Sequence, residues 1–393
     1  MLNSGMKQHN FNKVFPKYFN VKGKFLLGRS NMKTKFHGID LHKRYATIMI
    51  RDSEGVEIQF IPKCTNFKTY TESLSQNDSV VIESINNAFY WSDQIEKQGA
   101  SCIIVDPHKF KIIKDSWNKT DKRDAANLSL ALWMSEIKKE FKMPAIYKPL
   151  VQIRELRKLF AEYQMITNQI RQYKNSIQAI FVENGIALDK KTAYKLFKID
   201  GDILILEKFN LSKVSKECII ISLLLTWALS EQKEIIKDSI LDMGTLFEKE
   251  IKLCISIKGI TPFLVLAFFA DIGDIKRFKN IRGFDAYLGV VPTVKSSGGK
   301  TQMGHINRQS RKLARTLFTQ PINHIADSSD FMKKFYDDVK LRRGAGRSRI
   351  AVIRKVFNIM RRMILTGVEY RYKDDQIYDK KLKEFEKIIH KAA

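Results

Sequence analysis

The chain has 393 residues, enough for two or three domains, and its hydrophobic content of 44% is that of a globular protein, which excludes a disordered chain. The formal net charge of +27, from 69 Lys and Arg against 42 Asp and Glu, predicts a polyanionic partner, nucleic acid first and an anionic membrane second. No apolar run reaches the roughly 18 residues of a membrane-spanning helix, so we expect no membrane insertion. The four scattered cysteines form no C-x-x-C pair, which indicates neither a zinc site nor a disulfide framework. We therefore expect the protein to work in the reducing cytoplasm.

Residues 1–35 form a basic segment without Asp or Glu. Its apolar patch, Phe25-Leu26-Leu27, is too short for the hydrophobic region of a signal peptide. We expect a disordered basic arm, which either binds nucleic acid or results from an upstream start codon, with Met32 in place of Met1 as the native start.

Residues 36–140 predict a mixed α/β sheet of ribonuclease H type. Short apolar or alternating runs, typical of strands, come first as a β-meander and then alternate with helical stretches. A helix is expected from about Asp121 to Ile137. The expected strands are 37–41, 45–50, 56–61, 79–83 and 102–105.

Four acids of this domain form a candidate metal site. Asp40 lies on the first strand, and Glu83 ends an apolar strand, where an acid is costly unless it is paired or binds a metal. Asp121 and Asp124 lie three residues apart, on one face of the following helix. An all-carboxylate set favours Mg²⁺, and two ions about 4 Å apart could activate a nucleophile and stabilise the leaving oxygen of a phosphodiester. In the alternative interpretation, Asp40 accepts hydrogen bonds from nearby amides and Glu83 forms a salt bridge. Asp121 and Asp124 would then lie at a helix start because the helix dipole favours acids there.

Residues 141–255 predict a helical spacer. One long helix over 150–184 carries mostly apolar residues at a 3–4 spacing, the pattern of a coiled-coil seam. A seam within one chain, in a helical hairpin, and a seam between two chains fit this pattern about equally well. The seam residues are Ile153, Leu156, Phe160, Tyr163, Thr167, Ile170, Lys174, Ile177 and Phe181.

Residues 256–372 predict a mainly helical, strongly basic domain, and residues 373–393 a mixed-charge tail. The stretches 286–326 and 339–368 contain no acid, so their helices must face phosphates or repel one another. The run Ser296-Ser297-Gly298-Gly299 is either an ordinary flexible loop or one whose backbone can approach a phosphate closely. The expected nucleic-acid-binding residues are Lys295, Lys300, Arg308, Arg311, Lys312, Arg342, Arg343, Arg347 and Arg349.

Taken together, these motifs resemble the DEDD transposases of bacterial insertion sequences, the insertion sequence one-ten family of bridge-RNA-guided recombinases. The resemblance covers about residues 36–372. Its N-terminal motifs are Gly38-Ile39-Asp40-Leu41-His42-Lys43, Ile82-Glu83-Ser84 and Lys119-Thr120-Asp121-Lys122-Arg123-Asp124-Ala125. Its C-terminal motifs are Gly259-Ile260-Thr261-Pro262, Ala270-Asp271-Ile272-Gly273-Asp274-Ile275-Lys276-Arg277-Phe278, Gly289-Val290-Val291-Pro292 and Ser296-Ser297-Gly298-Gly299-Lys300.

The resemblance implies a RuvC-like domain, a coiled-coil spacer and a C-terminal transposase domain with a catalytic serine. It implies Mg²⁺-dependent strand exchange between donor and target DNA, guided by a structured RNA from the non-coding end of the element. The acids Asp40, Glu83, Asp121 and Asp124 would bind the metal. By motif position the serine that forms a covalent link to DNA is Ser297, with Ser296 as its close competitor.

Recombination handles several DNA ends at once, so we expect the 153–181 seam to pair with another chain in a homo-oligomer, a dimer or tetramer. The acids and the serine lie far apart in the sequence, which predicts a composite site that forms only when RNA and DNA are bound. Two other functions fit the same residues. A metal-dependent nuclease or Holliday-junction-type resolvase would use the acids with water and no serine, and a non-catalytic nucleic-acid-binding protein would need neither.

Overall fold

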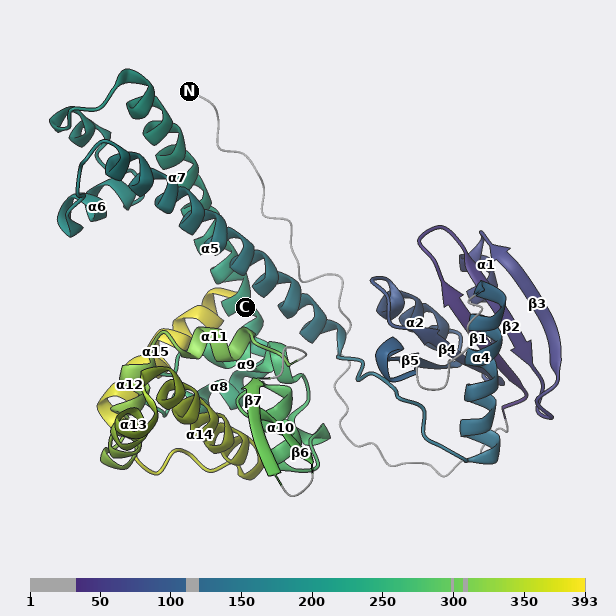
Figure 1. The fold of residues 1–393 in the computed structure, drawn as a ribbon. Helices are drawn as coiled ribbons and strands as arrows, with labels where there is room; N and C mark the ends of the chain where they lie inside the picture. Colours follow the sequence, from purple (N-terminus) through teal and green to yellow (C-terminus); the bar gives the residue numbers. More distant parts are fainter. Residues whose placement is uncertain (1–32, 111–119, 298–299, 307–309, 393) are drawn as a thin grey trace. The chain divides into compact units, whose positions relative to one another are not determined.

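The computed structural model describes residues 33–110, 120–297, 300–306 and 310–392, which form two compact units divided after Lys148. The first unit contains a five-stranded mixed sheet, and the second is mainly helical (Figure 1). This confirms the predicted class, an α/β domain followed by helical regions. The predicted basic arm lies outside the described residues except for its last three positions.

The sheet of the first unit has the strand order β3-β2-β1-β4-β5. Its first three strands form the predicted antiparallel meander, and β4 and β5 run parallel to β1, each after a helical connection. The parallel strands are short and buried, which explains their continuous apolar runs. The strands are β1 (Lys35–Leu41), β2 (Ala46–Arg51), β3 (Glu57–Cys64), β4 (Asp78–Glu83) and β5 (Ser101–Val105).

Helices cover both faces of this sheet. On one face, Ile39 and Ile82 share a core with Ile95 of α2. On the other, Val81 shares a core with Leu128 of α4. Because side chains alternate along a strand, Asp40 and Glu83 point to the α4 face. The helices of the unit are α1 (Phe67–Glu72), α2 (Ala88–Lys97), α3 (Pro107–Phe110), α4 (Asp121–Trp133) and a π-helical turn (Met134–Lys138).

Gly38 sets the distance between β1 and α4. A Cβ atom at this position would overlap the carbonyl oxygen of Ala125 and the amide nitrogen of Ser129, both backbone atoms of α4. Only glycine therefore allows the helix backbone to lie directly on the strand. This close contact holds the first turn of α4 next to the end of β1, two residues beyond Gly38.

A helical hairpin begins the second unit. Its long arms, α5 (Val151–Glu183) and α7 (Lys213–Asp242), pack on each other, with α6 (Lys190–Phe197) and a 3₁₀ turn (Ile203–Lys208) at the far end (Figure 1). Ile177 and Phe181 near the end of α5 share a core with α7. The structure thus favours the seam within one chain over the expected pairing of this seam with another chain.

The rest of the second unit forms one core around the apolar helix α9. Leu156 of α5 and Phe385 of α15 are both fully buried there, so the base of the hairpin and the predicted tail are packed into this unit. No described helix is long and apolar enough to span a bilayer. The remaining elements are the 3₁₀ turns Met243–Phe247 and Ile275–Arg277, α8 (Glu248–Cys254), α9 (Pro262–Ile272), α10 (Ile281–Tyr287), β6 (Pro292–Ser297), β7 (Lys300–Ile306), α11 (Leu313–Phe318), α12 (Ile322–Ala326), α13 (Asp330–Arg343), α14 (Ala345–Thr366) and α15 (Asp375–Ala392).

Candidate metal centre and nucleic-acid interface

Two parallel strands and one helix bring the four predicted acids together. The β1–β4 register ends with the pair Ile39–Ile82, so Asp40 and Glu83 follow at the same edge and on the same face. Thr120 caps α4 by accepting a hydrogen bond from the Arg123 amide, which places Asp121 and Asp124 in the first turn. Asp124 is only 6% exposed.

His42 and Tyr45 connect the acids of the strand and the helix. His42 Nε2 lies 3.2 Å from Asp40 Oδ2 and 3.3 Å from Asp121 Oδ2. The Tyr45 hydroxyl donates a hydrogen bond of 3.3 Å to the same Asp121 oxygen, and the two aromatic rings stack with centroids 4.4 Å apart. One ligand atom from each of Asp40, His42 and Asp121 lies within 4.8 Å of the others, a spacing that suits one bound cation.

The electrostatics of Asp40 reflect the other three predicted acids nearby. Burial raises the pKa of the Asp40 carboxyl above its ordinary value, and the negative charges of Glu83, Asp124 and Asp121 raise it further. His42 acts in the opposite direction but does not cancel them. A divalent cation would offset this concentration of negative charge.

The donor atoms fit a divalent metal. His42 Nε2 is buried and makes no well-directed hydrogen bond among the described residues, although both carboxylates lie within ion-pair distance. Carboxylate oxygens are the ligands that Mg²⁺ prefers, and imidazole nitrogen is also accepted by first-row metals such as Mn²⁺. Sequence reasoning assigned no role to His42, although it follows Asp40 by two residues, the spacing that puts two side chains on one side of a strand.

The predicted serine loop is part of a β-hairpin. β6 and β7 pair in antiparallel fashion, with Ser296 opposite Thr301 and Ser297 opposite Lys300 as the last pair. Lys295 stands opposite Gln302 in the same ladder. Gly298, Gly299 and Arg308 lie outside the described residues. The pairing therefore sets the backbone of Ser297 next to that of Lys300.

Polar contacts connect α11 with the loop before β6 and with α9, and connect α9 with α5. Arg315 donates a hydrogen bond to the carbonyl oxygen of Gly289, and Asp271 accepts one of 2.8 Å from the amide of Ala314. Arg157 of α5 donates to the backbone carbonyls of Ala270 and Asp271, at 2.6 and 3.1 Å. Burial raises the pKa of Asp271 to about 6, even though the Ala314 amide and neighbouring arginines lower it. Sequence reasoning quoted the motif that contains Asp271 but did not detect this network.

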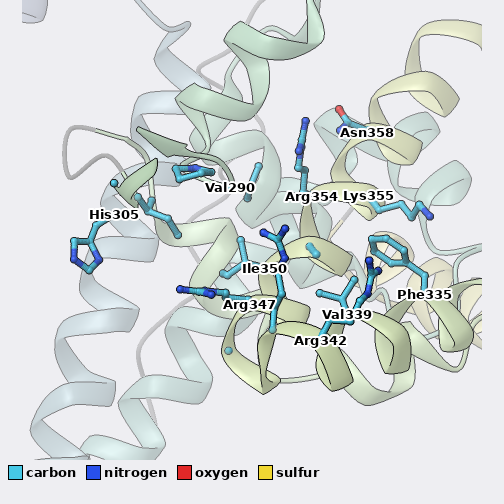
Figure 2. A pocket seen from close by; sticks show the side chains of 16 residues that line it. Val290, His305, Phe335, Val339, Arg342, Arg347, Ile350, Arg354, Lys355 and Asn358 are labelled. Atoms are coloured by element: carbon cyan, nitrogen blue, oxygen red, sulfur yellow. The ribbon is translucent and has the colours of Figure 1, made fainter. Parts of the chain in front are cut away.

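Several of the predicted basic residues line a pocket between the β6–β7 hairpin and the helices α13 and α14. The pocket has a volume of about 1030 Å³ and includes Arg342, Arg343 and Arg347 (Figure 2). Arg349 is exposed but does not line it. Arg311 and Lys312 are exposed just before α11. The predicted basic residues therefore belong to more than one surface of the second unit.

Comparisons with known proteins agree with these motifs. Residues 252–337, from the end of α8 to α13, match the family described as "Transposase IS116/IS110/IS902 family". The chain is 23% identical over 306 residues to "Transposase for insertion sequence element IS1111A" of Coxiella burnetii, a match that covers 74% of this chain and 79% of the relative. It is 27% identical over 128 residues to "Probable family 20 transposase" of Pseudomonas aeruginosa, covering 32% and 38% of the two chains. The family match and these relatives support a DNA transposase of the IS116/IS110/IS902 family.

Proposed function

We propose that this transposase exchanges DNA strands in a Mg²⁺-dependent reaction with a serine nucleophile, guided by a structured RNA from the non-coding end of the element. The observation that carries the proposal is the gathering of Asp40, Glu83, Asp121 and Asp124 at one sheet edge. Three separate elements contribute these acids, and their mutual repulsion is costly unless a cation is bound.

The four acids would hold the metal. When bound, Mg²⁺ supplies positive charge that stabilises the oxygens of a phosphodiester during its cleavage. Tyr45 and His42 contact Asp121, and His42 also contacts Asp40, so the two side chains would fix the directions of these carboxylates. His42 Nε2 is in addition a candidate ligand.

Ser297 would attack the phosphorus atom of one strand. Its oxygen would form the new bond to phosphorus while the DNA oxygen departs as a hydroxyl group, so that the number of phosphoester bonds is conserved. A covalent link of this kind can be passed to a second DNA end without hydrolysis. Lys295 and Lys300, on the paired strands next to the serine, would balance the phosphate charge.

The partners would be donor DNA, target DNA and the guide RNA, in a complex that contains more than one copy of the chain. The net charge of +27 and the acid-free stretches support contacts to several nucleic-acid strands at once.

Since the α5 seam is buried within the chain, we propose that copies meet through the exposed apolar residues Ile221, Leu224 and Leu225 of α7. Light scattering with and without RNA checks this, and a monomer in both states would contradict it.

The experiment that tests the catalytic proposal combines the protein, Mg²⁺, RNA transcribed from the flanking DNA, and donor and target duplexes. We expect a covalent protein–DNA adduct, mapped by mass spectrometry to Ser297, that disappears in Ser297→Ala while RNA binding remains. Ser296→Ala is the matched control and should keep the adduct.

Three results would contradict this proposal in different ways. An adduct on Ser296 or a tyrosine would move the nucleophile. Cleavage that continues in Ser297→Ala while strand transfer is lost would favour a metal-dependent nuclease or junction resolvase. Cleavage that does not depend on added Mg²⁺ would favour a non-catalytic role for the acids. The same conclusion would follow if the protein bound nucleic acid but catalysed no reaction.

A further inference from the structure

The pocket beside the hairpin has two chemically different parts. Its inner wall is apolar and includes Phe335 and Val339 of α13 and Ile350 of α14, together with Val290 just before β6. Five further lining residues are cationic, and Figure 2 shows arginine side chains of α13 and α14 around the apolar ones. The cationic residues are Arg342, Arg343, Arg347, Arg354 and Lys355.

The positive charge of this pocket is largely uncompensated. No Asp or Glu lines it. Arg354 is bound to the buried carboxylate of Asp285, with Nε and Oδ2 2.6 Å apart. Arg343 and Arg347 have no carboxylate partner in the part of the chain that the structure describes. The pocket therefore attracts an anion that can approach several guanidinium groups.

One face of α14 places polar and cationic groups along the pocket. Arg347, Ala351, Arg354 and Asn358 follow one another at intervals of three or four residues, so they share this face. The Asn358 Oδ1 atom is buried and has no hydrogen-bond partner among the described residues. An Asn amide can both donate to and accept from the edge of a nucleobase.

Lys355 adds a cation that is partly removed from water. Its ammonium group lies 4.0 Å from the ring centre of Phe331 and 3.8 Å from that of Phe335. Burial lowers the pKa of this lysine below its ordinary value. The Lys355 ammonium group, which lies against two aromatic rings, can therefore pair with a phosphate at the apolar wall.

We infer that this pocket binds unpaired nucleotides of the DNA substrate, with phosphates on the arginines and a base against the apolar wall. The inference rests on the proposed function, because it takes DNA at the serine hairpin as the substrate. Bases of an intact duplex are stacked on each other and cannot reach an apolar wall, whereas an unpaired base exposes its flat faces. Pockets for small ligands measure about 300–1,000 Å³, so this volume accommodates at least one nucleotide.

The position of the pocket connects it to the serine. Pro292 and Ile306, the first pair of the β6–β7 ladder, both line it, and Ser297 lies at the other end of the same ladder. A strand held in the pocket would thus be unpaired close to the hairpin. Strand exchange requires such a state, because a strand must leave its old partner before it joins a new one.

The test measures binding of short fluorescent oligonucleotides to the full chain carrying Ser297→Ala, in EDTA and without RNA. The probes are a single-stranded DNA, its duplex and a single-stranded RNA of the same sequence. We expect Arg347→Ala to weaken binding of the single-stranded DNA about tenfold and that of the duplex much less. Arg282→Ala, on an exposed arginine of α10 outside the pocket, is the matched control and should change neither affinity by more than about twofold.

A second variant, Ala351→Trp, fills the pocket without changing charge, and it should lower the affinity for single-stranded DNA only. Circular dichroism checks that it folds, and Arg347→Glu, on an exposed side chain, replaces it if it does not. Equal losses for strand and duplex, or an equal effect of Arg282→Ala, would overturn the inference. Tighter binding of the RNA with the same losses would assign the pocket to RNA and overturn the DNA assignment. Because the assay involves neither metal nor serine chemistry, its failure differs from a failure of the catalytic proposal.

Discussion

The acid cluster of the first unit and the basic pocket of the second are assembled in opposite ways. The cluster joins Asp40, Glu83 and the start of α4 through strand register and one backbone contact at Gly38. The pocket draws most of its charge from the consecutive helices α13 and α14. The five cations of the pocket have the same charge and can partly substitute for one another. Each acid of the cluster instead has a separate place around the site. The cluster should therefore be sensitive to single substitutions, and the pocket should lose function gradually.

The strongest test of this contrast is the removal of one acid. Asp124→Asn should lower metal-dependent DNA cleavage by roughly 100-fold or more, because no neighbouring group can replace a buried carboxylate. Cleavage rates at saturating Mg²⁺ provide the measurement. Asp52→Asn is the control, since Asp52 Oδ1 only accepts turn hydrogen bonds from the amides of Glu54 and Val56, which Asn can also accept. Equal rates for the two variants would remove the cluster from the chemistry.

The next effect concerns the backbone contact. Gly38→Ala should destabilise the first unit by about 3 kcal/mol or more, because the methyl group meets the backbone of α4 rather than a movable side chain. Urea unfolding measures the loss. Gly346→Ala is the control, since nothing lies within 4 Å of a Cβ at that position. A neutral Gly38→Ala would show that α4 does not depend on this contact.

A third test concerns the buried Asp271 in the second unit. Its pKa is raised to about 6, so the folded protein binds the proton more tightly than the unfolded chain, and this stabilisation is lost as pH rises from about 4 to 6. Asp271→Asn cannot ionise and still accepts from the Ala314 amide. Its advantage in unfolding free energy should grow over that pH range to at most about 3 kcal/mol. A constant difference from pH 4 to pH 8 would contradict the assignment.

The smallest effect per residue is expected for salt dependence. Each phosphate contact adds about −0.9 to the slope of log affinity against log salt concentration on duplex DNA. Reversing one charge between Arg342 and Arg362 should flatten the slope by about one unit, without changing sequence preference. Binding titrations at several salt concentrations measure it. A slope near zero in the unmodified protein would remove the basic surface from DNA binding.

The sequence predicted well what depends on local pattern. Apolar or alternating runs identified the strands of the first unit but not β6 and β7, and the cap at Thr120 agrees with a helix that begins at Asp121. Because the carboxyl ends of parallel strands meet at one edge, the grouping of Asp40 with Glu83 was also predictable once the sheet type was known.

What depended on distant contacts was not predictable. The periodicity of α5 showed which face is buried but not that α7 of the same chain covers it. The mixed charges after residue 372 predicted a tail and gave no sign of burial, whereas Phe385 is buried in the main core. His42 and Tyr45 gave no signal of their own, because their role arises only when α4 brings Asp121 to the end of β1.

The α5–α7 hairpin has a consequence for how the chain can vary in length. Both arms enter one core, where Leu156 and Phe160 of α5 join Ile240 of α7. The far end has a separate small core that includes Phe181 and Leu223. Matched insertions or deletions of about seven residues in each arm add or remove about two helical turns and keep the faces nearly aligned. Related chains can therefore differ in the reach of this arm while the two cores remain unchanged.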